Sequence, residues 1–117
     1  MSYRIDLLGF PFLERGVSRG PWQPAADVYR TQDGWLVKFD LAGVKTEDVT
    51  VRAAGHALIV SGVRRDMQTG QGLTAYLVEI AYSRFERRIE FPDDLDRACL
   101  TATFCNGMLV VRLRTRS

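Results

Sequence analysis

Residues 104–109 carry the clearest local signal in the chain and read Phe104-Cys105-Asn106-Gly107-Met108-Leu109. An Asn-Gly pair between two extended apolar runs is typical of a two-residue β-hairpin, because both turn positions require a positive φ angle. The second run continues with apolar side chains at every other position, namely Leu109, Val111 and Leu113. The sequence therefore predicts two antiparallel strands joined at residues 106–107.

Further strands are predicted on the N-terminal side of this hairpin. Apolar and polar side chains alternate in residues 35–41, 49–53 and 84–91, and residues 57–61 form a short apolar run after a Gly-His turn. A period of two residues indicates a strand with one buried face. No segment keeps a helical period, and only residues 45–48 suggest a single helical turn. We expect an all-β protein in which roughly seven to nine short strands form an antiparallel sandwich.

Length and charge limit the partners that the chain can have. It has 117 residues, with 16 basic and 14 acidic side chains and a formal net charge of +2. A chain of this length buries about two-thirds of its surface on folding, which suits one domain with a single core. Binding to nucleic acid or to an anionic membrane would call for a larger basic surplus or a concentrated basic patch. We therefore expect neither among the partners.

The chain lacks the sequence features of exported and membrane proteins. Its two cysteines do not make a disulfide framework. No uninterrupted apolar stretch exceeds four residues, far fewer than a bilayer-spanning helix needs. The first six residues contain no apolar signal-peptide region. We therefore expect a cytoplasmic protein.

Residues that usually carry catalysis or metal binding are missing or badly spaced. His56 is the only histidine and lies in a predicted turn. Cys99 and Cys105 fall on one predicted strand, about 20 Å apart, so we expect two small buried or half-buried thiols rather than a metal site. Residues 70–72 lack the Lys-Ser/Thr of a phosphate loop, and the aspartates of residues 93–96 are typical turn formers. We expect no catalytic residue, no metal, no cofactor and no enzymatic activity.

The first 24 residues form a segment of a different kind. Prolines and glycines interrupt it, yet it is rich in large apolar groups, which a merely disordered tail would lack. These groups are Tyr3, Ile5, Leu7, Leu8, Phe10, Phe12, Leu13 and Trp22. Such an arm either packs on the core of its own domain or contacts other chains.

A long connection precedes the strand predicted at residues 84–91. Residues 64–72 are polar, contain glycine and are long for a hairpin connection. A short apolar segment, residues 73–80, follows them. A long excursion with a strand of its own often serves another subunit.

Several sequence blocks, taken together, resemble a known family. They are Ala26-Asp27-Val28-Tyr29, Trp35-Leu36-Val37, Asp40-Leu41-Ala42-Gly43-Val44, Glu47-Asp48-Val49-Thr50-Val51, Leu58-Ile59-Val60-Ser61-Gly62, Phe85-Glu86-Arg87-Arg88-Ile89-Glu90-Phe91-Pro92 and Ala102-Thr103-Phe104-Cys105-Asn106-Gly107-Met108-Leu109-Val110-Val111. Their order and spacing closely resemble the α-crystallin domain of small heat shock proteins of the bacterial and plant type. The resemblance covers residues 25–113.

This resemblance implies a fold and an activity. The fold is an immunoglobulin-like antiparallel β-sandwich that forms an obligate homodimer and higher assemblies. The activity is that of an ATP-independent holdase, which binds unfolding client proteins and prevents their aggregation under stress. A holdase acts by mass action on the unfolded state, so the lack of a nucleotide loop agrees with it. The chain then divides into an N-terminal arm (1–24), an α-crystallin domain (25–114) and a vestigial C-terminal tail (115–117).

The resemblance also implies three interaction surfaces. Clients would bind the arm at Leu7, Leu8, Phe10, Phe12 and Leu13. They would also bind a groove between two strands, lined by Val49, Val51, Leu100, Ala102 and Phe104. The dimer would form through Arg87 and through a loop strand that pairs with the partner's sheet and includes Leu73, Tyr76 and Val78. Two of these assignments have an alternative that stays open. The groove residues are then plain core, and the stem of Arg87 extends so that its charge reaches water.

Two departures from the family pattern bear on assembly. Ala42 stands before Gly43-Val44 where the family usually has proline, which weakens a turn without removing any chemistry. Residues 114–117 are polar or charged and lack the family's Ile-x-Ile/Val tail motif, which plugs the groove of a neighbouring dimer. We therefore expect a dimer as the stable unit, with at most small or polydisperse assemblies made through the arm.

A second hypothesis comes from another class of protein. A related β-sandwich can serve as a non-enzymatic co-chaperone or adaptor that docks on one folded partner. Such a domain needs neither an apolar arm nor a strand-donating loop. It would be a strict monomer at micromolar concentration.

Overall fold

The strands predicted from the alternation are present. The computed structural model describes residues 22–65 and 72–115. In these residues the elements are β1 (Ala26–Arg30), β2 (Gly34–Asp40), the 3-10 helix η1 (Thr46–Asp48), β3 (Val49–Ala54), β4 (Ala57–Val63), β5 (Arg84–Glu90), β6 (Cys99–Cys105) and β7 (Met108–Arg114). The predictions of an all-β protein and of one helical turn at residues 45–48 are confirmed.

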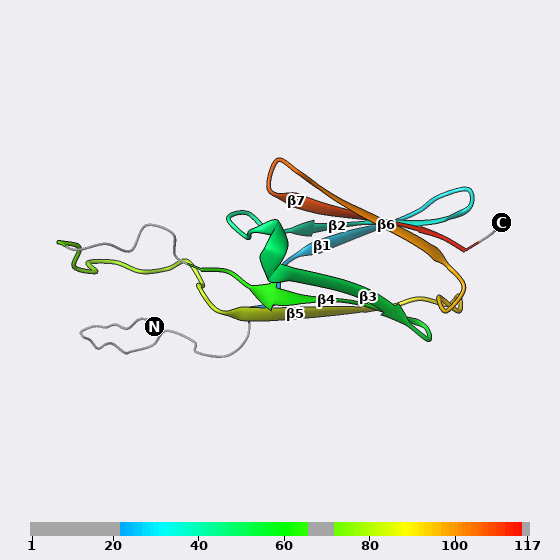
Figure 1. Ribbon diagram of the computed structural model, residues 1–117, viewed down its shortest axis with the longest axis horizontal. Coiled ribbons are helices and arrows are strands. Elements are labelled where there is room, and N and C mark those ends of the chain that lie inside the picture. The colour runs from blue at the N-terminus through cyan, green and yellow to red at the C-terminus, as the bar shows by residue number, and fades with distance from the viewer. Residues whose placement is uncertain (1–21, 66–71, 116–117) are drawn as a thin grey trace.

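The strands form two sheets that lie one above the other (Figure 1). One sheet has the order β1-β2-β7-β6 and the other the order β3-β4-β5. Every pair of neighbouring strands is antiparallel. The predicted antiparallel sandwich is therefore confirmed, with β1 and β6 as the border strands of one sheet and β3 and β5 as those of the other.

Apolar side chains of the alternating runs fill the space between the sheets. Val37, Phe39 and Val111 have no exposed surface at all. The core cluster also contains Leu41, Leu58, Val60, Phe85, Phe91, Leu95, Leu109 and Leu113. Burying one such side chain is worth about 1.5–3 kcal/mol. This cluster therefore holds the two sheets together.

The turn between β6 and β7 has the geometry that its sequence predicts. Asn106 and Gly107 are the two residues between β6 and β7, and both have positive φ angles, of 54° and 78°. The backbone N–H of Leu41 donates to the carbonyl of Gly107 over 3.0 Å. A Cβ atom on residue 107 would lie 3.4 Å from the Cα atom of Ala42. The hairpin thus packs closely against the chain that follows β2.

Acidic side chains close the loop between β5 and β6. Asp94 accepts the backbone N–H of Asp96 over 3.0 Å, which is a local turn contact. Asp96 in turn accepts the backbone N–H of Gly55 over 2.8 Å. The second bond ties this loop to the turn between β3 and β4. The prediction that these aspartates are turn formers is confirmed.

The prediction of buried or half-buried cysteines is wrong, because Cys99 and Cys105 are both exposed. They begin and end β6, a border strand. Leu100 and Phe104 of the same strand pack against the core, so the odd-numbered side chains lie on the outer face of the sheet. No further layer covers that face in the described part of the chain. Alternation showed which residues share a face, but not that the cysteine face lies outside.

Residues just before the boundary predicted at residue 25 pack against the domain. Trp22 pairs with Phe85 in an isolated parallel bridge, and the two ring centroids lie 5.5 Å apart in an edge-to-face arrangement. Pro24 is fully buried. Residues 22–24 therefore belong to the packing of the domain. The predicted client-binding residues of the arm lie outside the described part of the chain.

Candidate interaction surfaces

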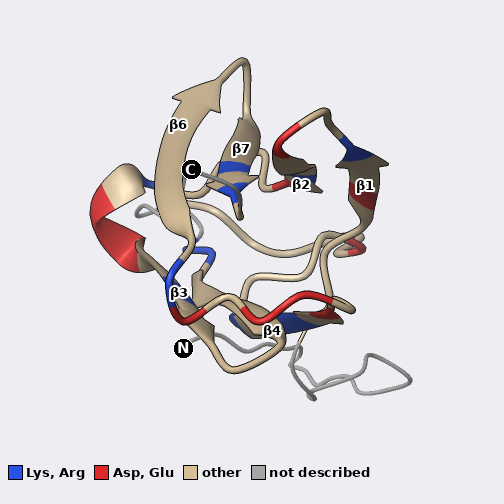
Figure 2. Cartoon of the chain, turned by 90° about the vertical axis from the view of Figure 1, so that its right-hand side faces the viewer, with Lys and Arg blue, Asp and Glu red and all other residues tan. Residues whose placement is uncertain are grey.

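Two border strands from different sheets lie on the same side of the molecule. Figure 2 shows β3 and β6 at this side, with β1 at the other. The predicted groove residues all sit on these two strands, namely Val49, Val51, Leu100, Ala102 and Phe104. We call the surface that these five residues form the β3–β6 side.

The residues of the β3–β6 side are neither plain core nor fully exposed. Val49, Val51, Leu100 and Phe104 pack against the core cluster and yet remain half-buried. Ala102, at the middle of β6, is exposed. A border strand has no neighbour on one flank, so its inward side chains are covered on one flank only. Their role in binding clients stays a prediction.

Residues 72–82 leave the sandwich as a long extension (Figure 1). No strand forms in them within the described chain. Their large apolar side chains are exposed: Leu73, Tyr76, Leu77, Val78, Ile80 and Tyr82. Tyr76 is 101% and Leu77 is 72% exposed. The prediction that Leu73, Tyr76 and Val78 pair with a partner's sheet stays a prediction, but this surface is the kind that marks an interaction site.

Arg64 holds the base of this extension in place. Its backbone N–H donates to Ser83 over 3.0 Å, and its Nε donates to the Ala81 carbonyl over 2.8 Å. One terminal nitrogen donates to the Ala42 carbonyl over 3.2 Å. The guanidinium also stacks over the Trp22 ring, 3.7 Å from its centroid. Burial against these groups lowers the pKa of Arg64 from its ordinary value.

Sequence reasoning did not find Arg64, which lies in a polar run with no local signal. Its four partners come from three separate segments of the chain, around residues 22, 42 and 81–83. Only the folded chain brings those segments together. The alternation of side chains along one strand therefore could not identify Arg64 as a contact between segments.

Arg87 lies on the inward face of β5, as the alternation predicts. It shares that face with Phe85 and Ile89 and is half-buried. One of its terminal nitrogens donates to the Pro24 carbonyl over 2.8 Å. Among the described residues this partner is a backbone carbonyl rather than the carboxylate expected of a buried arginine. Its placement at a dimer contact stays a prediction.

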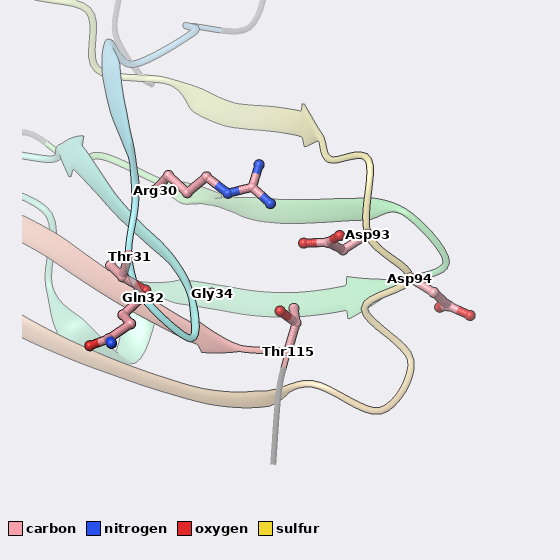
Figure 3. Close-up of a pocket in the computed structure, with 7 residues that line it drawn as sticks. All are labelled: Arg30, Thr31, Gln32, Gly34, Asp93, Asp94 and Thr115. Carbon is pink, nitrogen blue, oxygen red and sulfur yellow. The ribbon is translucent and has the colours of Figure 1, made fainter.

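A polar cavity of about 300 Å³ lies at the opposite end of the sandwich from the extension. Figure 3 shows its lining residues, which are Arg30, Thr31, Gln32, Gly34, Asp93, Asp94 and Thr115. Asp93 accepts the indole N–H of Trp35 over 2.8 Å, and the Arg30 guanidinium lies over the same ring, 4.6 Å from its centroid. These contacts hold the β1–β2 turn against the loop after β5. They are structural, and the lining contains no histidine or cysteine.

The described residues contain no group of three or more His, Cys, Asp and Glu side chains placed to hold a metal ion. His56 is exposed, and its backbone carbonyl accepts the N–H of Phe91 over 2.8 Å. In the part of the chain that the structure describes, no helix has the length and apolar character needed to cross a membrane.

A model of the Hsp20/alpha crystallin family matches residues 27–117. The chain belongs to this family. The match begins within β1 and takes in every later strand of both sheets. The resemblance seen in the sequence blocks is therefore confirmed.

Relatives in this family show both sequence and structural similarity. Spore protein SP21 of Stigmatella aurantiaca is 27% identical over 112 residues, which cover 96% of this chain and 66% of that protein. Heat shock protein 16 of Schizosaccharomyces pombe is 33% identical over 97 residues, which cover 80% of this chain and 67% of that protein.

Solved structures of the family have the same fold. Heat shock protein 16.0 from Schizosaccharomyces pombe gives a TM-score of 0.71 at 31% identity, over 80% of this chain and 87% of that one. The hspA protein from Xanthomonas axonopodis gives 0.69 at 25% identity, over 83% and 97% of the two chains. The chain spans only part of its curated relatives: 58% of small heat shock protein C2 of Rickettsia felis and 48% of the chloroplastic protein of Triticum aestivum.

Proposed function

We propose that the protein is an ATP-independent holdase chaperone, which binds partly unfolded proteins and prevents their aggregation under stress. The observation that carries this proposal is the β3–β6 side, where apolar side chains that pack on the core stay half-buried instead of being fully covered. Apolar side chains that gather uncovered on a folded domain mark a site of interaction. Membership of the Hsp20/alpha crystallin family supports the proposal, as do relatives named heat shock proteins.

The β3–β6 side suits an extended apolar segment of a client. Both strands are borders of their sheets in the described chain, so a client segment can add main-chain hydrogen bonds to its side-chain contacts. The side chains on this surface carry no charge. A site of this kind selects apolar composition rather than one sequence, which suits a chaperone with many clients. In the same proposal the arm provides a second apolar surface.

The proposed dimer uses the extension, residues 72–82. We place it along β1 of a second copy, because β1 is a border strand and its Val28 and Tyr29 are 41% and 46% exposed. A two-fold dimer lets each copy cover the extension of the other. Arg87, bonded to Pro24 just before β1, lies beside this edge. This arrangement leaves the β3–β6 side free for clients.

Such an activity needs no nucleotide. A protein that binds the unfolded state lowers the free concentration of that state, and with it the rate of aggregation. When the free concentration of the chaperone is about 100 times the dissociation constant, binding lowers the free energy of the unfolded client by about 2.7 kcal/mol. Binding alone therefore has a sufficient effect on a client that is only marginally unstable.

Light scattering of a heated client tests the proposal. A stoichiometric amount of the protein, without ATP, should suppress the rise in scattering. Ala102→Asp places a charge on the exposed part of the β3–β6 side and should weaken the suppression. Thr103→Asp places the same charge on the outer face of the same strand and serves as the control.

Two outcomes would count against the holdase. Aggregation that the native chain leaves unchanged would overturn the proposal. A strict monomer at micromolar concentration, measured by sedimentation, would point to an adaptor that binds one folded partner.

A further inference from the structure

The free edge of β6 has a hydrogen-bonding pattern that follows from its neighbours. The bond from Leu41 to Gly107 shows that odd-numbered residues of β2 and β7 bond to each other. The even-numbered residues of β7 therefore bond to β6, where they lie opposite odd-numbered residues. The N–H and C=O groups of Leu100, Ala102 and Phe104 are left on the free edge, with no partner strand in the described chain.

The sequence of β6 is nearly the same in both directions. It reads Cys99-Leu100-Thr101-Ala102-Thr103-Phe104-Cys105, and only the exchange of leucine for phenylalanine breaks the symmetry. Edge strands are usually protected from pairing by charged residues or proline, and β6 contains neither. Figure 2 shows the strand without charge along its whole length at the border of its sheet.

A second copy of β6 fits this edge in one symmetric register. An antiparallel pair with its two-fold axis at Ala102 places that residue opposite its own copy. Thr101 then lies opposite Thr103, and Cys99 lies opposite Cys105. The β-branched threonines meet on the outer face, which is a favourable cross-strand pair. The near-palindrome thus makes the strand complementary to itself.

The same register brings the thiols within bonding distance. In this register Ala102 and its copy would form a hydrogen-bonded pair through their free N–H and C=O groups. Hydrogen-bonded and non-hydrogen-bonded pairs alternate along antiparallel strands, so the Cys99–Cys105 pair, three positions away, is not hydrogen-bonded. The Cα atoms of such a pair lie about 4.5 Å apart, within the range of about 4.4–6.8 Å that disulfides span. Within one chain the same two residues lie about 20 Å apart and cannot meet.

We propose that oxidation links two copies of this chain edge to edge through β6, with Cys99 of each copy bonded to Cys105 of the other. Both thiols are exposed, so a small oxidant reaches them. Each disulfide forms when two thiols lose two protons and two electrons to hydrogen peroxide, which becomes two molecules of water. The reaction consumes two molecules of peroxide for each pair of chains.

This link has a consequence for the molecule as a whole. The edge of β6 lies on the side opposite β1, so the disulfides join copies at a place that the extension does not use. They also cover the edge of the β3–β6 side. Peroxide therefore lowers the access of other strands to this edge. The covalent pairing itself does not depend on the proposed chaperone activity.

Two single-cysteine variants test the register. Cys105→Ser keeps only Cys99, Cys99→Ser keeps only Cys105, and a small affinity tag on one of them separates mixed from self-linked dimers by mass. After treatment with hydrogen peroxide and non-reducing electrophoresis, the mixed dimer should exceed each self-linked dimer by about tenfold, because like cysteines lie about 20 Å apart in this register. A mixed dimer in no more than the roughly twofold excess that random pairing gives, or no covalent dimer, would overturn the proposal.

A pair of charge variants with both cysteines present tests the strand pairing directly. Thr101→Glu with Thr103→Glu places like charges opposite each other in the register and should lower the yield of covalent dimer several-fold. Thr101→Lys with Thr103→Glu places opposite charges there and should restore it. Both positions are exposed, so circular dichroism should show the same strand content. Equal yields of covalent dimer from the two double variants would show that β6 edges do not pair.

Discussion

Arg64 joins segments that are far apart in the sequence through both the nitrogens and the flat face of its guanidinium. The nitrogens donate to the carbonyls of Ala81 and Ala42, while the flat face stacks on Trp22. A lysine has the charge but neither the planar fork nor the stacking face. The position of the extension therefore depends on the shape of this side chain as well as on its charge.

Arg64→Lys should lower the free energy of unfolding by about 1–3 kcal/mol, because one ammonium group cannot donate to both backbone carbonyls and also stack on Trp22. Urea unfolding followed by circular dichroism measures this. Arg65→Lys is the control, because Arg65 pairs with Asp48 at an exposed position, with 61% of its own side chain accessible, and such pairs contribute less than about 1 kcal/mol. Equal stability of the two variants would show that Arg64 is an ordinary surface charge.

Arg87→Ala should lower the thermal midpoint, because it leaves the Pro24 carbonyl in a part-buried site without its donor. The expected cost is about 1–3 kcal/mol, less than for a stranded carboxylate. Arg88→Ala on the exposed face of β5 is the matched control, since its side chain is 57% accessible. Sedimentation of the Arg87 variant should also show a weakened dimer. A thermal midpoint equal to that of the Arg88→Ala variant would mean that the contact to Pro24 contributes nothing to stability.

At the scale of single elements, the border strands and the extension carry what the protein offers to other chains. Inner strands such as β4 and β7 have neighbours on both flanks and contribute to the core. β1, β3 and β6 each keep one free edge in the described chain. Unpaired edges are sites for adding strands. The proposed dimer uses the edge of β1, whereas the client surface and the disulfide-linked pair both involve the edge of β6.

Tyr76→Asp should convert the proposed dimer to a monomer. The side chain is fully exposed in the single chain, so the substitution removes nothing from the fold, but it places a charge in an apolar interface. Sedimentation at micromolar concentration measures the mass, and circular dichroism should not change. Glu79→Gln, in the same extension, is the control and should remain dimeric. A dimer that tolerates Tyr76→Asp would place the interface elsewhere.

At the scale of the whole molecule, the boundary between arm and domain determines which truncation is informative. Trp22 contacts Arg64 and Pro24 contacts Arg87, so both residues take part in the packing of the domain. A deletion that removes them changes stability and client binding together. A deletion that stops at residue 21 keeps both of these contacts.

Deletion of residues 1–21 should leave a folded domain whose protection of clients is lower. The arm supplies much of the apolar surface that the sequence offers to clients, so protection falls, while the core cluster is untouched. Circular dichroism and light scattering of a heated client measure the two effects. Deletion of residues 1–24 should also lower the thermal midpoint, because Arg64 and Arg87 lose partners. Full protection by the shorter deletion would exclude the arm as a client surface.

Local patterns in the sequence determined the strands and their turns. The alternation at Val37 and Phe39 predicts an inward face because successive side chains of a strand point to opposite sides. Asn106-Gly107 predicts a hairpin because few residues adopt a positive φ angle. These inferences need only neighbours along the chain. They placed the predicted groove residues on two strands without showing that both strands are borders.

Only the tertiary structure decided which edges and faces stay uncovered. The exposure of Cys99 and Cys105 follows from the order β1-β2-β7-β6, which puts their strand at a border. The carbonyl partner of Arg87 and the four contacts of Arg64 come from segments that the fold alone brings together. A periodic pattern specifies which residues share a face, whereas strand order and layering decide what that face meets. That order results from long-range packing of the whole core, which no short stretch of the chain contains.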